Sequence, residues 1–380
     1  MELILKQYDI PLLRFSATND SSTPEIEVHW INEDQRHLLP LDMELSPEGI
    51  SRWMRRRTIP RNRAYVNRLL AKCGLNANRP MGILALCKGL SVDDSYWVVE
   101  EGFKGTFEKY NLFENRFSEV LALIAFTGYG SSNRSSLASS PEFTTNGMLP
   151  KCWRRISGKV TLYKGGTDGG YNTGAEPYCE YYAAQVAAAM GIDAIPYGLS
   201  QWKGRLCSTC ELFTDIDHAY MPIGNLVQRG GFDAVAAYYE NLGEPFQKAF
   251  RDMLVFDAVI CNTDRHYGNF GFMIDNKTNT IAAPAPLFDH GNSLFNQAGP
   301  EDYESPEAFQ QYIDTLVPCV YDDFFATAKR FMADENREQL RKLLEFRFKR
   351  HVRYNLPPKR LKLMEEQVRK RAMRLLENKE

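Results

Sequence analysis

Three oxygen-bearing side chains, far apart along the chain, are the strongest chemical signal in the sequence. Asp264 and Asn269 stand five positions apart in the run NTDRHYGN (262–269), and Asp289 stands in the run LFDHG (287–291). A carboxylate can orient a hydroxyl group and accept its proton during phosphoryl transfer, and carboxylate and amide oxygens can hold the Mg²⁺ that accompanies a nucleotide. The pattern D-x-x-x-x-N followed by D-x-G therefore predicts a site for phosphoryl transfer.

The elements around these residues favour such a site over a structural alternative. In that alternative Asp264 and Asn269 only form Asx turns in a polar loop. This alternative would be sufficient if Asp264 were the only such residue. Apolar residues at helical spacing over 246–260 predict a helix before the loop, and the runs 270–274 and 280–285 predict the two strands of a hairpin. A helix, a D-x-x-x-x-N loop, a hairpin and a D-x-G turn together would bring the three side chains to one place.

A second pair of charged residues lies upstream. Lys164 ends an alternating run over 160–164 that predicts a strand, and Glu180 opens an alanine-rich run that predicts a helix over 181–190. Kinases use a strand lysine to neutralise the phosphates of ATP and a helix glutamate to hold that lysine. We therefore expect Lys164 and Glu180 to form this pair.

Two alternatives to this pair remain open. Lys159 is the rival lysine and Glu176 the rival acid. A surface lysine, together with a glutamate placed at a helix N-terminus by the helix dipole, would give the same pattern without any catalytic role.

The remaining nucleotide contacts are predicted from position alone. The segment 206–213 would form the strand and hinge that receive the adenine, through backbone groups near Glu211 and Leu212. No G-x-G-x-x-G motif occurs, and the best substitute for a phosphate-binding loop is a polar run that contains an Asn-Gly turn signal. The residues of this run are Thr144, Thr145, Asn146 and Gly147. A polar linker is the alternative for the whole passage 127–146.

The run N-T-D-R-H-x-x-N (262–269) resembles the catalytic loop of HipA-like serine/threonine kinases, the toxin kinases of bacterial toxin–antitoxin systems. Its D-R-H-x-x-N core is also similar to that of phosphatidylinositol kinases. The resemblance to the HipA-like catalytic region covers 149–294. It implies a kinase that uses ATP and Mg²⁺, with Asp264 as catalytic base, Asn269 and Asp289 as magnesium ligands, and Arg265 and His266 as braces of the loop.

The resemblance also implies partners. A HipA-like kinase would phosphorylate a protein, by family analogy a translation factor, and would autophosphorylate a serine in its phosphate loop. Candidate acceptors lie at 131–140 and 144–145. A separately encoded antitoxin-like repressor and a bacterial host follow from the same analogy. No match is found over the first hundred residues, which leaves the presence of such a repressor open.

The order of the predicted elements favours an α+β, two-lobed protein-kinase-like fold with an extra N-terminal region. We expect residues 1–125 to form this region, 126–213 a small β-rich N-lobe, and 214–380 a larger helical C-lobe. With 380 residues the chain is long enough for two or three packed units.

Composition excludes several classes of protein. The chain is 44% hydrophobic and 25% charged, which is typical of a globular protein rather than a disordered one. A net charge of −2 argues against a protein that coats nucleic acid with its whole surface. No apolar stretch is long enough to span a bilayer, the N-terminus lacks a secretory pattern, and the eight cysteines are sparse. We therefore expect a cytoplasmic protein without a membrane partner.

One basic segment stands out against this neutral background. A helical pattern over 46–72 contains a run of arginines with one tryptophan, at 52–63. A nucleic-acid or acidic-partner surface and a solvated helix face both explain it.

The sequence is consistent with three functions. The first is a HipA-like serine/threonine kinase. The second is a kinase fold that binds nucleotide and regulates without chemistry, and the third is a lipid or small-molecule phosphotransferase.

Overall fold

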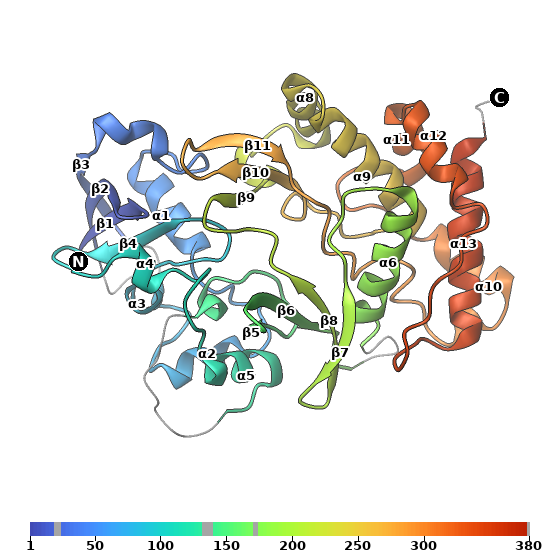
Figure 1. Ribbon diagram of the computed structural model, residues 1–380, viewed down its shortest axis with the longest axis horizontal. Coiled ribbons are helices and arrows are strands. Elements are labelled where there is room, and N and C mark those ends of the chain that lie inside the picture. Colours follow the sequence, from blue (N-terminus) through green and yellow to red (C-terminus); the bar gives the residue numbers. More distant parts are fainter. Residues whose placement is uncertain (19–23, 131–139, 170–173, 378–380) are drawn as a thin grey trace. The chain divides into compact units, whose positions relative to one another are not determined.

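A computed structural model describes residues 1–18, 24–130, 140–169 and 174–377 of the chain (Figure 1). Apart from these gaps the chain divides into two compact units. Unit 1 contains Met1–Lys164, Glu211–Met221 and Met273–Ala282, and unit 2 contains Gly165–Cys210, Pro222–Phe272 and Ala283–Glu380. The elements are a mixture of helices and β-strands, and the predicted α+β class is confirmed.

The division between the units lies at Lys164–Gly165, inside the range predicted as an N-lobe. Unit 1 also takes two short segments from later in the chain. The three predicted functional domains, 1–125, 126–213 and 214–380, stay a prediction.

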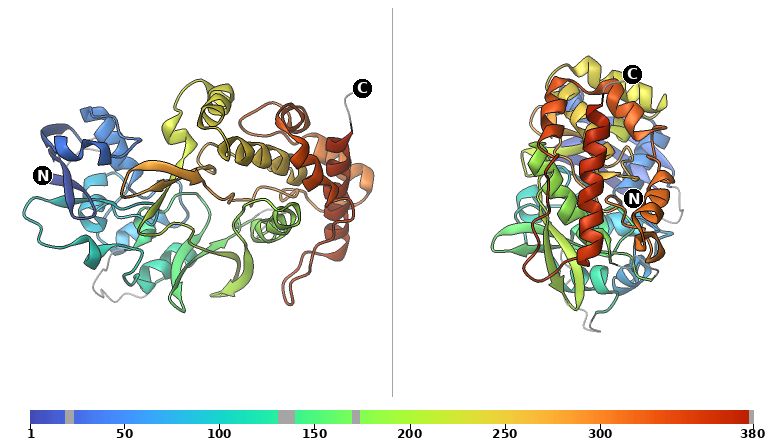
Figure 2. Two further views of the ribbon diagram at one scale, coloured as in Figure 1. Left: turned by 45° about the horizontal axis from the view of Figure 1, so that its top comes forward. Right: turned by 90° about the vertical axis from the view of Figure 1, so that its right-hand side faces the viewer.

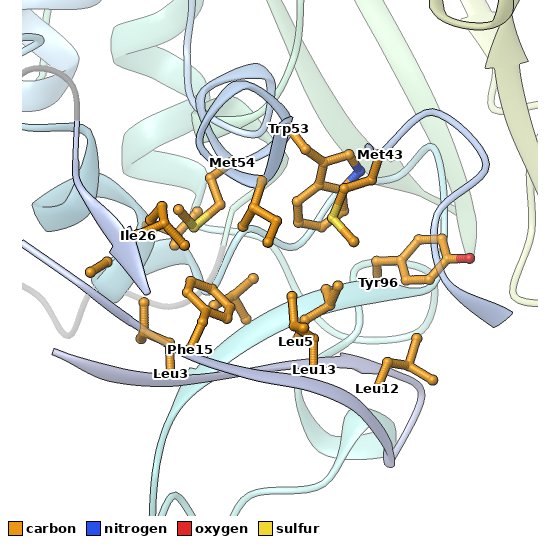
Figure 3. Close-up of a cluster of buried hydrophobic side chains, with 14 of the residues drawn as sticks. Leu3, Leu5, Leu12, Leu13, Phe15, Ile26, Met43, Trp53, Met54 and Tyr96 are labelled. Carbon is orange, nitrogen blue, oxygen red and sulfur yellow. The ribbon is translucent and has the colours of Figure 1, made fainter. Parts of the chain in front are cut away.

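An antiparallel four-stranded sheet begins unit 1. Its strand order is β3 (Ile26–Ile31), β2 (Ile10–Ala17), β1 (Glu2–Gln7) and β4 (Tyr96–Glu100). Alternate residues of β1 are buried because one face of the sheet covers a core, and Leu3 pairs with Phe15 as Leu5 pairs with Leu13. Figure 3 shows this core, to which Trp53 contributes from a neighbouring helix.

The helices of unit 1 fill the sequence between these strands and beyond. They are α1 (Pro47–Arg56), α2 (Val66–Lys72), α3 (Pro80–Cys87), α4 (Phe107–Tyr110) and α5 (Glu119–Thr127), with the 3-10 helices η1 (Glu33–Leu38) and η2 (Pro141–Phe143). The helical pattern over 46–72 thus forms two helices rather than one. Pro60 lies between them and cannot continue a helix, because it lacks the backbone N–H that the helix needs.

The predicted strand 160–164 is confirmed as part of a hairpin. β5 (Lys151–Ile156) pairs antiparallel with β6 (Lys159–Gly165) across a two-residue turn. Both turn residues, Ser157 and Gly158, have positive φ, as the mirror-image turns of hairpins require.

The later segments of unit 1 form a small sheet in the order β11-β10-β9. These strands are β9 (His218–Pro222), β10 (Gly271–Asp275) and β11 (Thr280–Pro284), and the tip of the β10–β11 hairpin belongs to unit 1. Asn279 at this tip donates its side-chain N–H groups to the carbonyls of His37 and Leu39, at 2.9 and 2.7 Å.

Unit 2 begins with α6 (Glu176–Met190), and here the prediction that Glu180 opens the helix is wrong. The helix begins four residues earlier because Pro177 lies in its first turn, where a proline needs no hydrogen-bond partner. Glu180 therefore lies in the second turn. A hairpin of β7 (Gly198–Trp202) and β8 (Arg205–Glu211) follows, and β8 overlaps the strand predicted within 206–213.

Helices make up most of the rest of unit 2 (Figure 2). They are α7 (Ile223–Leu226), α8 (Gly231–Leu242), α9 (Phe246–Ile260), α10 (Pro306–Asp314), α11 (Phe324–Phe331), α12 (Asp334–Arg341) and α13 (Pro358–Leu376), with η3 (Glu301–Tyr303). α9 packs against α6, α8, α11, α12 and α13, and every residue over 252–260 is buried. In the described part of the chain, no helix is long and apolar enough to cross a membrane.

Candidate active site

The end of α9 positions the loop that carries Asp264 and Asn269. Cys261 ends the helix with positive φ, and Asn262 then accepts a hydrogen bond from the Asp264 backbone N–H at 3.1 Å. Asn262 also donates its side-chain amide to Asp257 in the helix, at 3.1 Å. The loop therefore contains an Asx turn, but the side chain that forms it belongs to Asn262. The Asp264 side chain is not used in this turn.

Asn269 closes the same loop. Its side-chain Nδ2 donates to the Asp264 carbonyl at 3.2 Å, and its backbone N–H donates to the His266 carbonyl at 2.9 Å.

 Because the Nδ2 group of Asn269 faces the Asp264 carbonyl, Oδ1 is the atom that its predicted role as a magnesium ligand would use.

Arg265 ties this loop to the loop that carries Asp289. Its guanidinium is buried and makes two hydrogen bonds to the Asp257 carboxylate, at 2.9 and 3.1 Å. The same group donates to the carbonyls of Asn269 and Phe288, at 3.2 and 2.6 Å. One side chain thus joins α9, the D-x-x-x-x-N loop and the D-x-G turn, and the brace predicted for Arg265 has a physical basis.

The ion pair between Arg265 and Asp257 is fully buried. Burial alone would lower the pKa of Arg265, but the Asp257 carboxylate outweighs it and raises that pKa. Burial raises the pKa of Asp257, and the guanidinium offsets part of this rise. The guanidinium therefore stays charged and keeps its five donors directed at fixed acceptors.

Asp289 has an unusual backbone conformation. Its φ is 56°, in the left-handed region, and its N–H donates to the hydroxyl of Tyr197 at 3.0 Å. Burial raises the pKa of Tyr197 well above its ordinary value, and the carboxylates of Glu180 and Asp289 raise it further. Strained backbone of this kind persists where surrounding contacts impose it, and it is frequent at functional sites.

Both candidate acids of α6 lie beside the D-x-G turn. Glu180 is fully buried and accepts a short hydrogen bond from the Ser208 hydroxyl of β8. Glu176 is also buried and accepts from the backbone N–H and the hydroxyl of Thr167, the former at 3.1 Å. A Cβ atom added at Gly291 would lie 3.3 Å from Glu176 Cβ and 3.6 Å from Glu180 Oε1. Gly291 therefore lies in close contact with α6, with little space for a side chain.

The candidate lysines belong to unit 1. Lys164 is buried in β6, and the residue opposite it in β5 is Lys151. Lys159 is exposed and forms a surface ion pair with Glu211 at 2.7 Å. This pairing gives Lys159 a surface role, whereas the pairing of Lys164 with Glu180 stays a prediction.

The predicted nucleotide contacts also lie in unit 1. The backbone N–H of Leu212 donates to the Val160 carbonyl at 2.9 Å, and the carboxylate of Glu211 is the one that pairs with Lys159. Thr144 donates its hydroxyl to the Leu90 carbonyl at 2.9 Å, and Thr145 donates to the Pro141 carbonyl at 2.7 Å.

These hydrogen bonds hold the local fold of unit 1, and the predicted nucleotide contacts of Thr144, Thr145, Glu211 and Leu212 stay predictions. Gly147 has a φ of 89°, and the Asn146 carbonyl beside it accepts from Lys151 Nζ at 2.9 Å. The predicted phosphate-loop role of 144–147 stays a prediction. Of the candidate serine acceptors, those at 131–139 lie outside the described residues.

His266 is exposed, unlike Arg265. Its Nδ1 accepts from the Gly268 backbone N–H at 3.0 Å, which stabilises the local turn. A catalytic role for His266 stays a prediction.

Four residues of the site were missed from the sequence. They are Asp257, Tyr197, His290 and Asn292. Asp257 stands as the one acid in the apolar run 253–260, which is a signal in the sequence, and Asn292 donates to Asp264 Oδ2 at 2.8 Å. His290 is buried, and its Nδ1 lies 3.0 Å from Arg265 Nη2. No local pattern distinguishes Tyr197, because its contact with the Asp289 backbone spans 92 positions.

The oxygen donors of the site suit magnesium. Within the described ranges, no group of three or more His, Cys, Asp or Glu side chains is arranged to hold a metal ion. The predicted ligands are one amide and one carboxylate, Asn269 and Asp289. Magnesium commonly binds through one or two protein oxygens and takes its other ligands from water and phosphate, so these residues fit it.

The chain is similar in part of its sequence to a known kinase. No protein-family model matches it. The serine/threonine-protein kinase CtkA of Helicobacter pylori is 27% identical over 135 residues, which cover 32% of this chain and 41% of that protein. The matched region thus spans less than half the length of this curated relative.

Two solved structures share the fold. The crystal structure of the H. pylori proinflammatory kinase CtkA has a TM-score of 0.50 at 15% identity and covers 61% of this chain and 90% of its own. HipA of Shewanella oneidensis, in complex with HipB and its operator DNA, has a TM-score of 0.53 at 13% identity and covers 98% of this chain and 97% of its own. The predicted resemblance to HipA-like kinases and the kinase-like fold are thereby confirmed.

Proposed function

We propose that this chain, with its HipA-like kinase fold, is an ATP- and Mg²⁺-dependent serine/threonine protein kinase. The observation that carries the proposal is the set of hydrogen bonds from Arg265 to Asp257, Asn269 and Phe288. It joins the D-x-x-x-x-N loop to the D-x-G turn within unit 2. Such a join is what a site with a base on one loop and metal ligands on both requires.

Each side chain has a separate task in the proposed reaction. Asp264 orients the substrate hydroxyl and accepts its proton, while the hydroxyl oxygen forms a bond to the γ-phosphorus and the bond to ADP breaks. Asn269 and Asp289 would hold the Mg²⁺ that neutralises charge on the phosphates. Lys164 would neutralise the α- and β-phosphates, with Glu180 holding its ammonium group.

The test is transfer of labelled phosphate. Purified protein with labelled ATP and Mg²⁺ should label itself or a protein substrate, and Asp264→Asn and Asp289→Asn should each reduce labelling by at least about 100-fold. Both changes preserve side-chain size, and unchanged melting temperatures would show that the variants are folded. Equal labelling by the wild type and both variants would contradict the proposal.

Two other functions give different results in the same assay. A regulatory nucleotide-binding protein would be stabilised by Mg²⁺ and ATP without turnover. A lipid or small-molecule phosphotransferase would label an organic extract rather than protein. We favour protein as the substrate because CtkA, the relative matched in sequence, is named a serine/threonine-protein kinase.

The partners follow by analogy. HipA of S. oneidensis is bound to HipB and operator DNA, and we propose a separately encoded antitoxin-like repressor here. By the same analogy the substrate is a translation factor, the host is bacterial and autophosphorylation occurs. A cytoplasmic location fits the eight cysteines, all in the described part of the chain and none in a disulfide.

A DNA-facing role for 52–63 would rest on a reduced set of arginines. Arg57 is buried in an ion pair with Asp94 at 2.6 Å, and Arg63 is fully buried against Glu142 at 2.6 Å. The exposed arginines of the run are Arg52, Arg55 and Arg61. Loss of DNA binding by a triple glutamine variant of these three would support that role.

A further inference from the structure

The segment after the D-x-G turn returns to the loop that carries Asp264. The backbone carbonyl of Asn292 accepts hydrogen bonds from the backbone N–H and the hydroxyl of Thr263, at 3.1 and 3.2 Å. The side chain of Asn292 donates from Nδ2 to Asp264 Oδ2 at 2.8 Å. Asn292 therefore contacts the loop through both its backbone and its amide.

A second asparagine fixes which way this amide points. Asn296 is buried, and its Nδ2 donates to Asn292 Oδ1 at 2.9 Å. An amide has its acceptor oxygen on one side and its donor nitrogen on the other. Because the oxygen of Asn292 faces Asn296, its NH₂ group faces the carboxylate of Asp264.

We propose that Asn292 is a positioning residue that holds the Asp264 carboxylate in the orientation needed for phosphoryl transfer. The inference rests on the proposed function. A carboxylate has two oxygens, and a hydrogen bond to Oδ2 leaves Oδ1 to face the substrate hydroxyl. A base held in one orientation acts faster than one that rotates, because fewer of its conformations are unproductive.

The chemical step remains that of the kinase reaction. The hydroxyl oxygen bonds to the γ-phosphorus, the bond between the γ-phosphorus and the bridging oxygen breaks, and ADP leaves with that electron pair. The hydroxyl proton passes to Asp264 Oδ1. Asn292 neither gives up nor accepts a proton, so its removal should slow the step without preventing it.

Two substitutions separate this role from a purely structural one. Asn292→Asp keeps the size of the side chain and an acceptor for Asn296, but it replaces the donor to Asp264 with a carboxylate. Asn292→Ala removes the side chain and keeps the backbone carbonyl that Thr263 uses. Asn296→Ala removes the donor to Asn292 Oδ1, so the amide of Asn292 is free to rotate. Gln297 is an exposed residue of the same segment, and Gln297→Ala is the matched control.

The kinetic measurements are kcat and the KM for ATP with saturating Mg²⁺, together with the melting temperature. We expect kcat to fall about 10- to 100-fold in both Asn292 variants and less in Asn296→Ala, while the KM for ATP changes less than about twofold. Gln297→Ala should match the wild type in all three quantities.

Other results would overturn the inference in distinguishable ways. An active wild type with unchanged kcat in both Asn292 variants refutes the inference and leaves the proposed function standing. A lower kcat accompanied by a raised KM and a lowered melting temperature in Asn292→Asp assigns a structural role instead. A wild type that transfers no phosphate refutes the proposed function and this inference with it.

Discussion

Arg265 joins three parts of the candidate site through a single side chain. Its hydrogen bonds reach a helix, the loop of the candidate base and the turn of a candidate metal ligand. A lysine would carry the same charge but not the planar set of donors that these acceptors need. The shape of the guanidinium, rather than its charge alone, holds the two loops together.

Arg265→Lys should therefore reduce phosphate transfer while leaving the charge of the site unchanged. We expect a fall in kcat of about 10- to 100-fold, because outer contacts of a metal site typically contribute this much. Steady-state kinetics with labelled ATP would measure it. Arg251→Lys, in the preceding helix α9 and in a surface ion pair with Glu244, is the control and should stay near the wild-type rate. Equal rates for all three proteins would contradict the organising role.

Asp93 carries a pKa shift with a clear consequence for stability. Burial, followed by the charge of Asp94, raises the pKa of Asp93 to about 6, although Ser91 and Arg57 lower it in part. The unfolded chain would release this proton near a pH of about 3.9. Between these two values the folded state binds more protons than the unfolded state, so stability falls as pH rises.

Asp93→Asn should remove this pH dependence. The free energy of unfolding of the variant, relative to the wild type, should increase as pH rises from about 4 to about 6 and then level off. Because Asp93 is half-buried, we expect a total change of no more than about 2 kcal/mol. Urea unfolding across this range measures the difference, and a difference that is constant with pH would rule out the shift.

At the scale of elements, the basic run 52–63 joins separate parts of unit 1. The Arg63 guanidinium bonds to the Glu142 carboxylate, to the Glu142 carbonyl and to the Lys151 carbonyl, at 2.6, 2.6 and 2.8 Å. Glu142 in turn accepts from the Trp153 backbone N–H at 2.8 Å. The segment before α2 is thereby attached to η2 and β5.

Arg63→Met should destabilise unit 1 by about 3–5 kcal/mol, because it leaves the buried Glu142 carboxylate without its charged partner. Arg61→Met, two positions away and exposed, is the matched control and should change stability by less than about 0.5 kcal/mol. Chemical unfolding of both variants would test this contrast. Similar free energies of unfolding for Arg63→Met and Arg61→Met would mean that the buried ion pair contributes little to stability.

Elements with a local pattern were the ones that could be predicted. The strand ending at Lys164 and the helix before the Asp264 loop were read from alternation and helical spacing, and both are present. The alanine-rich run alone places the start of α6 at Glu180, whereas the helix begins at Glu176 because its first turn accommodates Pro177. The sheet of unit 1 could not be predicted, because β1 pairs with β4 across β2, β3 and three α-helices, and no local pattern reveals a pairing between such distant segments.

The same distinction holds within the site. Asp264, Asn269 and Asp289 could be found because their spacing is a motif, and the structure places their loops together through Arg265. Asn292 could not be found in this way, because an asparagine after a turn is ordinary and its hydrogen bond to Asp264 spans 28 positions. The role of Asn292 can be inferred only from its contacts in the folded chain.

At the scale of the whole molecule, unit 1 is discontinuous in sequence. Its N-terminal stretch makes hydrogen bonds with both later segments: Gln7 Nε2 donates to the Asn276 carbonyl at 2.6 Å, and Tyr8 Oη donates to the Ile216 carbonyl at 2.7 Å. A prediction of contiguous domains cannot include this arrangement, because the order of residues does not show which late segment packs with an early one.

A fragment of residues 1–164 should therefore fold less stably than unit 1 does in the full chain. It would lack Glu211–Met221 and Met273–Ala282, and it would leave the buried Gln7 side chain without its carbonyl partner. Circular dichroism melting would compare the fragment with the full chain. A fragment that melts at the same temperature would show that these later segments are dispensable.

The β10–β11 hairpin is one of the places where the chain passes between the two units. Its tip is a part of unit 1, whereas the two stems on either side of it run directly to Asn269 and Asp289 in unit 2. Short stretches of backbone therefore connect this one tip in unit 1 to both candidate magnesium ligands in unit 2.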